Sequence, residues 1–195
     1  GGDGTVDFSE WFDELVAREV VARRGPGAFP GEVEYSFRHA LLRETAYATL
    51  TEGDRVLGHR LAGEWLEKAG ETDAIALGEH FDRGGVASRA VVWYHRGAEQ
   101  ALEANDFVAA IERAERGVAC GATGQVLGEL RLIQANAHFW QGGYVVTTQC
   151  AAQAVEQIPC GTARWFEALD YLAMACGHQG QLDEAARWAQ QAATT

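Results

Sequence analysis

The sequence predicts an all-α protein of stacked helical hairpins, preceded by a short helix and a β-hairpin. The main observation is repetition, because the stretch beginning Asn105-Asp106-Phe107 returns as Gly142-Gly143-Tyr144 and again as Gly180-Gln181-Leu182. A repeat of this length is typical of helical hairpins stacked in an array. The second observation is the alternation of apolar and polar residues over 33–38, which is the period of a half-buried strand.

Small residues recur at fixed places within each copy of the repeat. They stand three, seven and ten positions after the opening apolar or aromatic residue, as in Ala110, Ala114 and Gly117 after Phe107. These spacings place them on one face of a helix, where neighbouring helix backbones can approach closely. We therefore expect the following alanines to be buried at helix contacts: Ala110, Ala114, Ala135, Ala151, Ala173 and Ala189.

The N-terminal segment predicts one helix followed by the β-hairpin. Apolar residues from Phe8 to Val16 keep the spacing of an amphipathic helix that Asp7 can cap. Gly and Pro residues over 25–31 then separate two candidate strands, 20–24 and 33–38. Helix, strand, loop and strand make up the second half of a winged helix, and we assign 1–50 to this partial winged-helix segment. We expect its first half to lie upstream, in a longer protein.

From His39 onward the pattern is helical. Thr51 is the expected cap of the helix over 52–69, with Asp54 at the third helical position. The expected hairpins cover 52–84, 88–120, 125–157 and 163–193, and together they form the second region, 51–195. Leu77-Gly78 followed by Ala90 also fits a repeat one helix out of phase. We prefer the later frame because it holds across three copies.

Residues 88–195 resemble the tetratricopeptide repeat (TPR). An apolar or aromatic residue, two positions after Asn or Gly, opens each second helix, and the small first-helix position falls at Ala98, Ala135 and Ala173. The resemblance implies a right-handed α-α superhelix. It indicates little about function, because this scaffold serves many partners.

The segment Glu34 to Leu50, with Phe37-Arg38-His39-Ala40-Leu41 at its centre, is similar to bacterial STAND-class (AAA-type) signalling ATPases. In those proteins a nucleotide-binding domain precedes a winged helix and TPR-like repeats, and relatives are fused to Ser/Thr kinases, nucleotide cyclases or LuxR-type regulators. The resemblance implies that His39 matches a winged-helix histidine that touches ADP in the off state. The alternative is a capping or packing histidine.

Composition excludes several classes of function. The net charge of −12 leaves no basic patch for nucleic acid, so we expect no nucleic-acid partner. We also expect no membrane partner and a cytoplasmic location, since no apolar run is long enough to span a bilayer and no signal peptide is evident. The spacing of Cys120, Cys150, Cys160 and Cys176 fits no metal motif, so buried free thiols are expected.

Catalytic motifs are missing from the sequence. Lys68 is followed by Ala69 and cannot end a phosphate-binding loop, and neither a nucleophile elbow nor a zinc-protease motif occurs. We expect a non-catalytic protein with no cofactor and no metal.

The TPR resemblance implies that the first helix of each hairpin lines a concave groove. Its consensus positions carry over to Val92, His95, Glu99, Leu102 and Glu103; to Glu129, Leu132, Asn136, Phe139 and Trp140; and to Glu167, Asp170, Met174, Gly177 and His178. The basic residues of the carboxylate-clamp subfamily are missing, which disfavours an acidic C-terminal peptide. A basic or amphipathic protein segment suits these residues better. Phe139 and Trp140 could instead pack against the next hairpin.

These observations predict a protein-interaction module with a regulatory, sensor role. Three alternatives remain open at this stage. The repeats could bind a small-molecule inducer that stacks on Phe139 and Trp140, or the chain could be part of a DNA-binding regulator that uses Arg23 and Arg24. It could also be a structural spacer.

Overall fold

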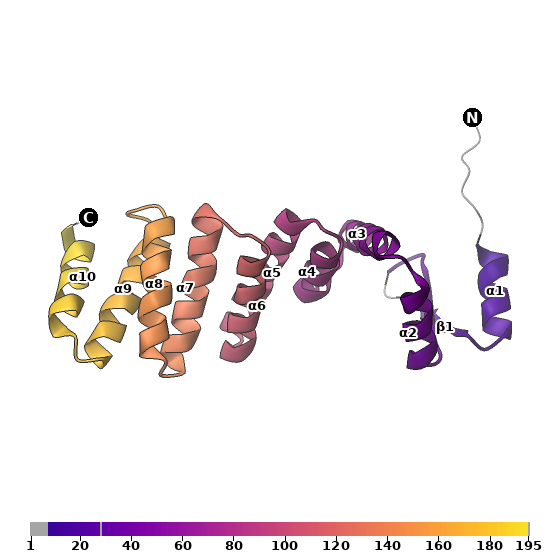
Figure 1. The fold of residues 1–195 in the computed structure, drawn as a ribbon, viewed down its shortest axis with the longest axis horizontal. Coiled ribbons are helices and arrows are strands. Elements are labelled where there is room, and N and C mark those ends of the chain that lie inside the picture. Colours follow the sequence, from indigo (N-terminus) through magenta and orange to yellow (C-terminus); the bar gives the residue numbers. More distant parts are fainter. Residues whose placement is uncertain (1–7, 28, 195) are drawn as a thin grey trace, which may run out of the picture. The chain divides into compact units, whose positions relative to one another are not determined.

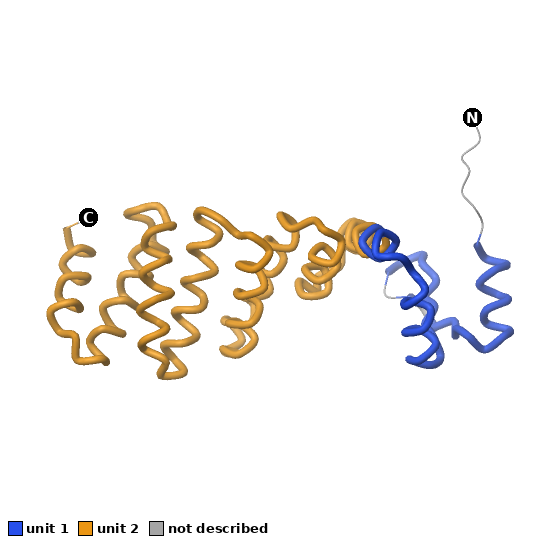
Figure 2. The backbone as a smooth tube through the Cα atoms, viewed as in Figure 1, with its two compact units in different colours: residues 1–57 blue, residues 58–195 orange. Residues whose placement is uncertain are grey.

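The computed structural model describes residues 8–27 and 29–194, and that part of the chain contains ten helices and one two-stranded antiparallel sheet (Figure 1). Contacts divide the chain into two compact units, 1–57 and 58–195 (Figure 2). The division falls inside helix α3 (Glu52–Ala69) rather than at the predicted position after residue 50. Arg55, in the first turn of α3, donates a hydrogen bond to the Ala48 carbonyl of the preceding helix, at 3.3 Å.

The first unit contains α1 (Ser9–Ala17), β1 (Val21–Pro26), β2 (Val33–Phe37) and α2 (Ala40–Thr49). The strands pair antiparallel with Val21 opposite Phe37, and Val21 is buried. The Phe12 ring of α1 stacks on Tyr35 of β2, with ring centroids 4.5 Å apart. This element order is the predicted helix, hairpin and helix. The expected cap Asp7 lies outside the described residues.

Helix α3 begins as the sequence predicts. The Thr51 hydroxyl accepts a hydrogen bond from the Asp54 backbone N–H at 3.2 Å and donates one to the Asp54 carboxylate at 2.6 Å. This arrangement satisfies one of the backbone N–H groups that have no partner within the helix.

The helices that follow form the predicted array of stacked hairpins, α4 (Ala74–Arg83), α5 (Ala87–Glu103), α6 (Phe107–Ala119), α7 (Gly124–Trp140), α8 (Tyr144–Gln157), α9 (Ala163–His178) and α10 (Leu182–Thr194). Each of them packs against the next along the chain, and α7 also contacts α5 and α9. The first helices of the three hairpins therefore lie side by side in one layer, in agreement with the later repeat frame.

The repeated opening of each copy marks the end of a first helix. Asn105, Gly142 and Gly180 all have positive φ angles, between 59° and 79°. The residue after each one donates its backbone N–H to a carbonyl five residues earlier, as Gly143 does to His138 at 2.8 Å. Glycine and asparagine tolerate this left-handed conformation best, which explains their place in the repeat.

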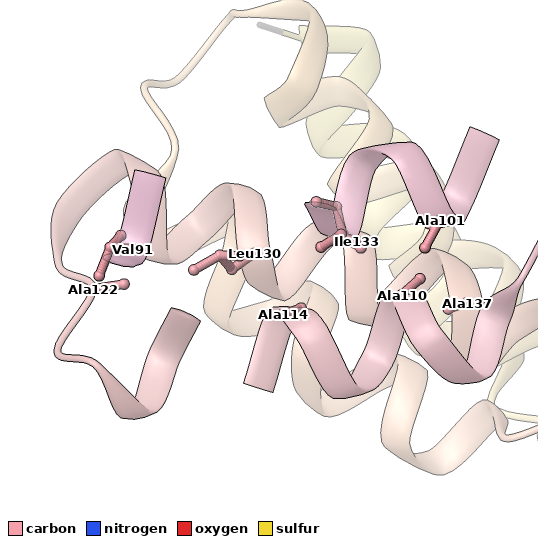
Figure 3. Packing of buried hydrophobic residues seen from close by; sticks show 9 residues of the cluster. Val91, Ala101, Ala110, Ala114, Ala122, Leu130, Ile133 and Ala137 are labelled. Atoms are coloured by element: carbon pink, nitrogen blue, oxygen red, sulfur yellow. The ribbon is translucent and has the colours of Figure 1, made fainter. Parts of the chain in front are cut away.

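Small residues fill the contacts between the helices, as predicted. Ala110 and Ala114 are fully buried in a cluster with Leu130 and Ile133 (Figure 3), and Ala135 and Ala151 are also fully buried.

The prediction was wrong for the last hairpin, where Ala173 is only half-buried and Ala189 is exposed. Both alanines occupy positions that a following hairpin would cover. In the described chain, α10 is the final helix and packs against α9.

Candidate functional site

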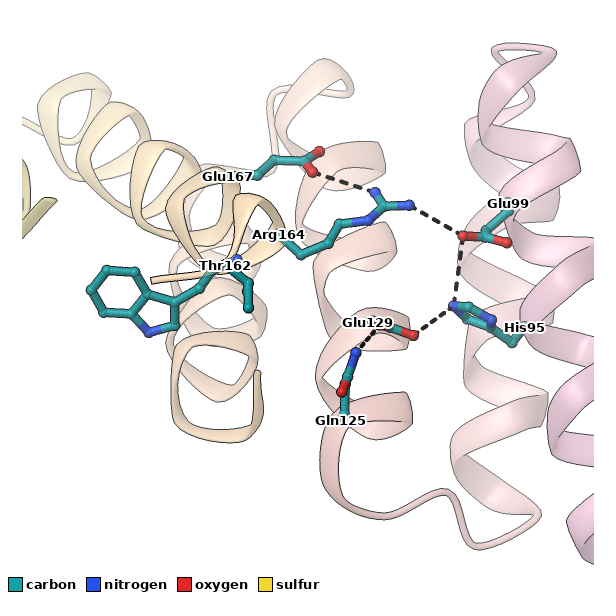
Figure 4. Close-up of polar contacts among 8 residues, drawn as sticks. His95, Glu99, Gln125, Glu129, Thr162, Arg164 and Glu167 are labelled. Carbon is teal, nitrogen blue, oxygen red and sulfur yellow. Dashed lines mark hydrogen bonds and ion pairs between the residues drawn. The ribbon is translucent and has the colours of Figure 1, made fainter. Parts of the chain in front are cut away.

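The layer of first helices brings many of the predicted groove residues to one face. We call this the first-helix face, and it contains His95 and Glu99 of α5, Glu129 of α7, and Arg164 and Glu167 of α9 (Figure 4). A row of polar contacts connects these side chains across three helices.

Arg164 is central to this row. Its guanidinium donates to Glu99 at 3.2 Å and to Glu167 at 3.3 Å, so that it joins α9 to α5 across 65 residues of sequence. Its side chain is 47% exposed, and salt bridges at such exposure contribute at most about 1 kcal/mol to stability. The contacts therefore position these groups more than they stabilise the fold.

His95 lies between two carboxylates. Its Nε2 atom is 3.5 Å from Glu129 and 3.8 Å from Glu99, while Gln125 donates to the other oxygen of Glu129 at 2.8 Å. The Nε2 atom is buried and has no hydrogen-bond partner, because neither carboxylate meets the geometry of a hydrogen bond. A buried polar atom without a partner is unfavourable, so the polar groups around His95 are not fully satisfied within the chain itself.

An aromatic cluster occupies the end of the layer where α7, α8 and α9 meet. The Phe139 ring meets the edges or faces of Tyr144, Tyr171 and His178, with centroids 5.5 to 5.6 Å away, and His178 stacks on Tyr144 at 4.3 Å. Phe139 is thus half-buried by packing, which was the alternative left open by the sequence.

The neighbouring residue Trp140 contacts the Phe139 ring, with centroids 5.8 Å apart, but 64% of its surface is exposed. Met174 on α9 is 44% exposed and lines a shallow hollow of about 280 Å³ together with Gly177 and His178. The face therefore carries exposed apolar surface as well as charge.

The other predicted groove residues are distributed unevenly. Leu132 is only 2% exposed and packs with Trp165 and Ile158, so it belongs to the core and cannot contact a partner. Leu102 is half-buried beside the core, and Asn136 is also half-buried. The exposed members include Val92, Glu103 and Asp170.

Arg164 and Gln125 were missed from the sequence because both precede the consensus groove positions of their helices. Arg164 stands three residues before Glu167, a helical ion-pair spacing that could have suggested it. Its contact with Glu99 depends on how α9 packs against the array, which the sequence does not reveal.

His39 lies in the first unit, at the junction of β2 and α2. Its backbone carbonyl accepts hydrogen bonds from the Leu42 and Arg43 backbone N–H groups, at 3.1 and 3.3 Å. The imidazole makes no capping hydrogen bond, and the residue is exposed. The structure therefore does not support a packing role or a side-chain capping role for His39. Its nucleotide-sensing role stays a prediction.

The cysteines are all free thiols. Cys150 and Cys176 are buried as predicted and Cys120 is half-buried, but Cys160 is exposed in the loop before α9. Burial raises the pKa of the Cys120 thiol to about 11, with the Asp82 carboxylate as a further cause. A thiol with such a pKa stays protonated near neutral pH and is a poor nucleophile.

No protein-family model matches the chain, and no curated protein is significantly similar to it. None of the helices within residues 8–27 and 29–194 combines the length and hydropathy needed to cross a bilayer.

Proposed function

We propose that the first-helix face binds a basic or amphipathic segment of a partner protein, and that the chain is a non-catalytic regulatory module. Charge supports this choice of partner. The predicted groove residues include the five acids Glu99, Glu103, Glu129, Glu167 and Asp170, and Arg164 lies among them on the same face. A cationic segment would be attracted to such a surface, most strongly at low salt.

The observation that carries the proposal is the arrangement of His95 between Glu99 and Glu129. The imidazole Nε2 is buried without a hydrogen-bond partner, and both carboxylates lie within 4 Å of it. Arg164 already demonstrates that the carboxylates of Glu99 and Glu167 are placed to receive one guanidinium between two helices. An arginine or lysine of a partner would find matching acceptors beside it.

Apolar residues at the other end of the face favour an amphipathic partner over a purely basic one. Trp140 and Met174 are both well exposed, and Asp170 lies one helical turn before Met174. Large exposed aromatic side chains are common anchors at protein interfaces. A partner helix or strand with one apolar and one basic side would use both parts of the face.

A small-molecule inducer is the second candidate, and the hollow beside Met174 is the feature that would hold it. Its volume of about 280 Å³ falls just below the range of about 300 to 1,000 Å³ typical of ligand pockets. The described residues that line it, Met174, Gly177 and His178, all come from α9. This shallow hollow suits a single side chain of a partner better than a whole ligand.

The proposal includes the parent protein that the sequence resembles. In a bacterial STAND-class ATPase, partner binding by the repeats would be passed through the winged-helix segment to an upstream nucleotide-binding domain. His39 would then sense the nucleotide state in the cytoplasmic full-length protein. The chain itself would supply recognition and no chemistry, since it contains no phosphate-binding loop.

A peptide array with basic amphipathic, acidic and neutral sequences tests the proposal. Basic amphipathic peptides should bind the wild type, and Trp140→Ala should weaken binding by about 2 kcal/mol if Trp140 is an anchor. The double variant Glu129→Gln, Asp170→Asn should bind more weakly as well. The matched control is Glu112→Gln, Glu156→Gln, which removes two exposed acids from the second helices α6 and α8. Equal loss in the control, or undiminished binding by both face variants, would exclude the first-helix face.

A further inference from the structure

Two histidines meet where α3 packs against α4, away from the first-helix face. The Nδ1 atoms of His59 and His80 lie 3.2 Å apart, and their ring centroids are 5.2 Å apart. Both side chains are half-buried.

Two glycines allow the helices to approach so closely at this point. A Cβ atom on Gly63 would lie 3.2 Å from the Cβ of His80. A Cβ atom on Gly84 would lie only 2.7 Å from the backbone nitrogen of Arg60. The close approach of the two backbones at Gly63 and Gly84 therefore brings the two imidazoles together.

The distances match those of two imidazoles that share one metal ion. Zn²⁺ binds histidine nitrogen at about 2.1 Å in tetrahedral geometry, which places two such nitrogens about 3.4 Å apart and their ring centroids about 5 Å apart. The observed separations of 3.2 and 5.2 Å are close to both values. Only a small movement of the rings would admit an ion.

We propose that His59 and His80 form a two-histidine site for a divalent transition-metal ion such as Zn²⁺, which joins α3 to α4. Imidazole ligands suit Zn²⁺, Cu²⁺ and Ni²⁺. Within residues 8–27 and 29–194, no group of three His, Cys, Asp or Glu side chains is placed to hold a metal, so water completes the coordination. The site is independent of the proposed partner-binding function.

The surroundings of His59 are compatible with metal binding. Burial, followed by the nearby His80 and Arg83, lowers the pKa of His59, while Glu79 acts in the opposite direction. His59 is therefore neutral near pH 7, which is the form that binds metals. In the metal-free pair one Nδ1–H faces the other Nδ1, and binding requires that this proton move to Nε2 of the same ring through solvent.

Isothermal titration calorimetry with ZnCl₂ at pH 7.5 tests the site on the full chain, purified without a histidine tag. The variants His59→Asn and His80→Asn keep an amide near the Nδ1 position but lose the imidazole ligand. Cys160→Ser is the control for the exposed thiol, because a thiol can also bind zinc. Circular dichroism and the melting temperature of each metal-free variant show whether it folds.

The expected result is one Zn²⁺ per chain for the wild type and for Cys160→Ser, with the dissociation constant raised at least tenfold in each asparagine variant. Zn²⁺ should also raise the melting temperature of the wild type and not that of the asparagine variants, because an ion that binds only the folded state stabilises it. Absence of binding, or binding that survives in either asparagine variant, would overturn the proposal. If one of those variants does not fold, His→Gln at the same position replaces it, and the same loss of Zn²⁺ binding is expected.

Discussion

Gly128 offers the sharpest test of how the hairpins pack. It is buried in the interior of α7, where a Cβ atom would lie 2.7 Å from Cγ1 of Ile158, 3.0 Å from Cβ of Gln157 and 3.2 Å from the Ile158 backbone nitrogen. Contacts below 3.0 Å require that something move. Since backbone atoms are involved and Ile158 is itself buried, the neighbours cannot simply rotate away.

The expected change in stability combines two opposing effects. Alanine in place of glycine inside a helix stabilises the folded state by about 0.5–1 kcal/mol. Overpacking a well-filled contact costs about 1–3 kcal/mol. We therefore expect Gly128→Ala to lower the free energy of unfolding by about 1 kcal/mol, which for a chain of this size corresponds to a melting temperature about 2–4 °C lower.

Gly58→Ala is the matched control for this substitution. Gly58 also lies inside a helix, α3, but nothing is within 4 Å of the position that its Cβ would occupy. It should show the propensity gain alone, about 0.5–1 kcal/mol. Urea unfolding followed by far-ultraviolet circular dichroism measures both variants. If Gly128→Ala is as stable as Gly58→Ala, then α7 does not approach the end of α8 as described.

Three further predictions concern packing, pH and catalysis. Ala135→Leu should lower the free energy of unfolding, measured in urea, by about 1–3 kcal/mol because Ala135 is fully buried. Ala173→Leu should lower it by less because Ala173 is half-buried, and equal losses would contradict the looser packing of the last hairpin. Burial is the main cause that raises the pKa of the Tyr94 hydroxyl from 10.0 to about 12. The stability that this group contributes is therefore fully present below pH 10.0, and it is lost as the pH rises from 10.0 through about 12. Tyr94→Phe should make the loss of stability over that window shallower, and an unchanged slope would show that Tyr94 does not cause it. The purified chain should hydrolyse ATP no faster than a mock preparation, and activity above that level would refute the non-catalytic assignment.

The helices and their order could be predicted because their signals are local. Helix periodicity, the Thr51 cap and the left-handed positions of Asn105, Gly142 and Gly180 depend on residues close in sequence. The repeat frame then identified which helices lie side by side in the layer of first helices.

The site was harder to predict because it depends on the rotation of each helix and on distant contacts. Phe139 and Trp140 are adjacent in sequence, yet one is packed among aromatic rings and the other is 64% exposed. Leu132 occupies a consensus groove position and is nevertheless in the core. The contact of Arg164 with Glu99 links residues 65 positions apart, beyond the reach of any local pattern.

The most direct test of the proposed partner-binding face uses the single methionine of the chain, Met174. Its side chain is 44% exposed on α9, so one ¹³C-labelled methyl resonance reports on that part of the face. On titration with a basic amphipathic peptide that binds by fluorescence anisotropy, the account predicts that this resonance shifts in step with binding and that the affinity falls as salt is added. A peptide that binds while the Met174 resonance stays unmoved, or an affinity indifferent to salt, would contradict it.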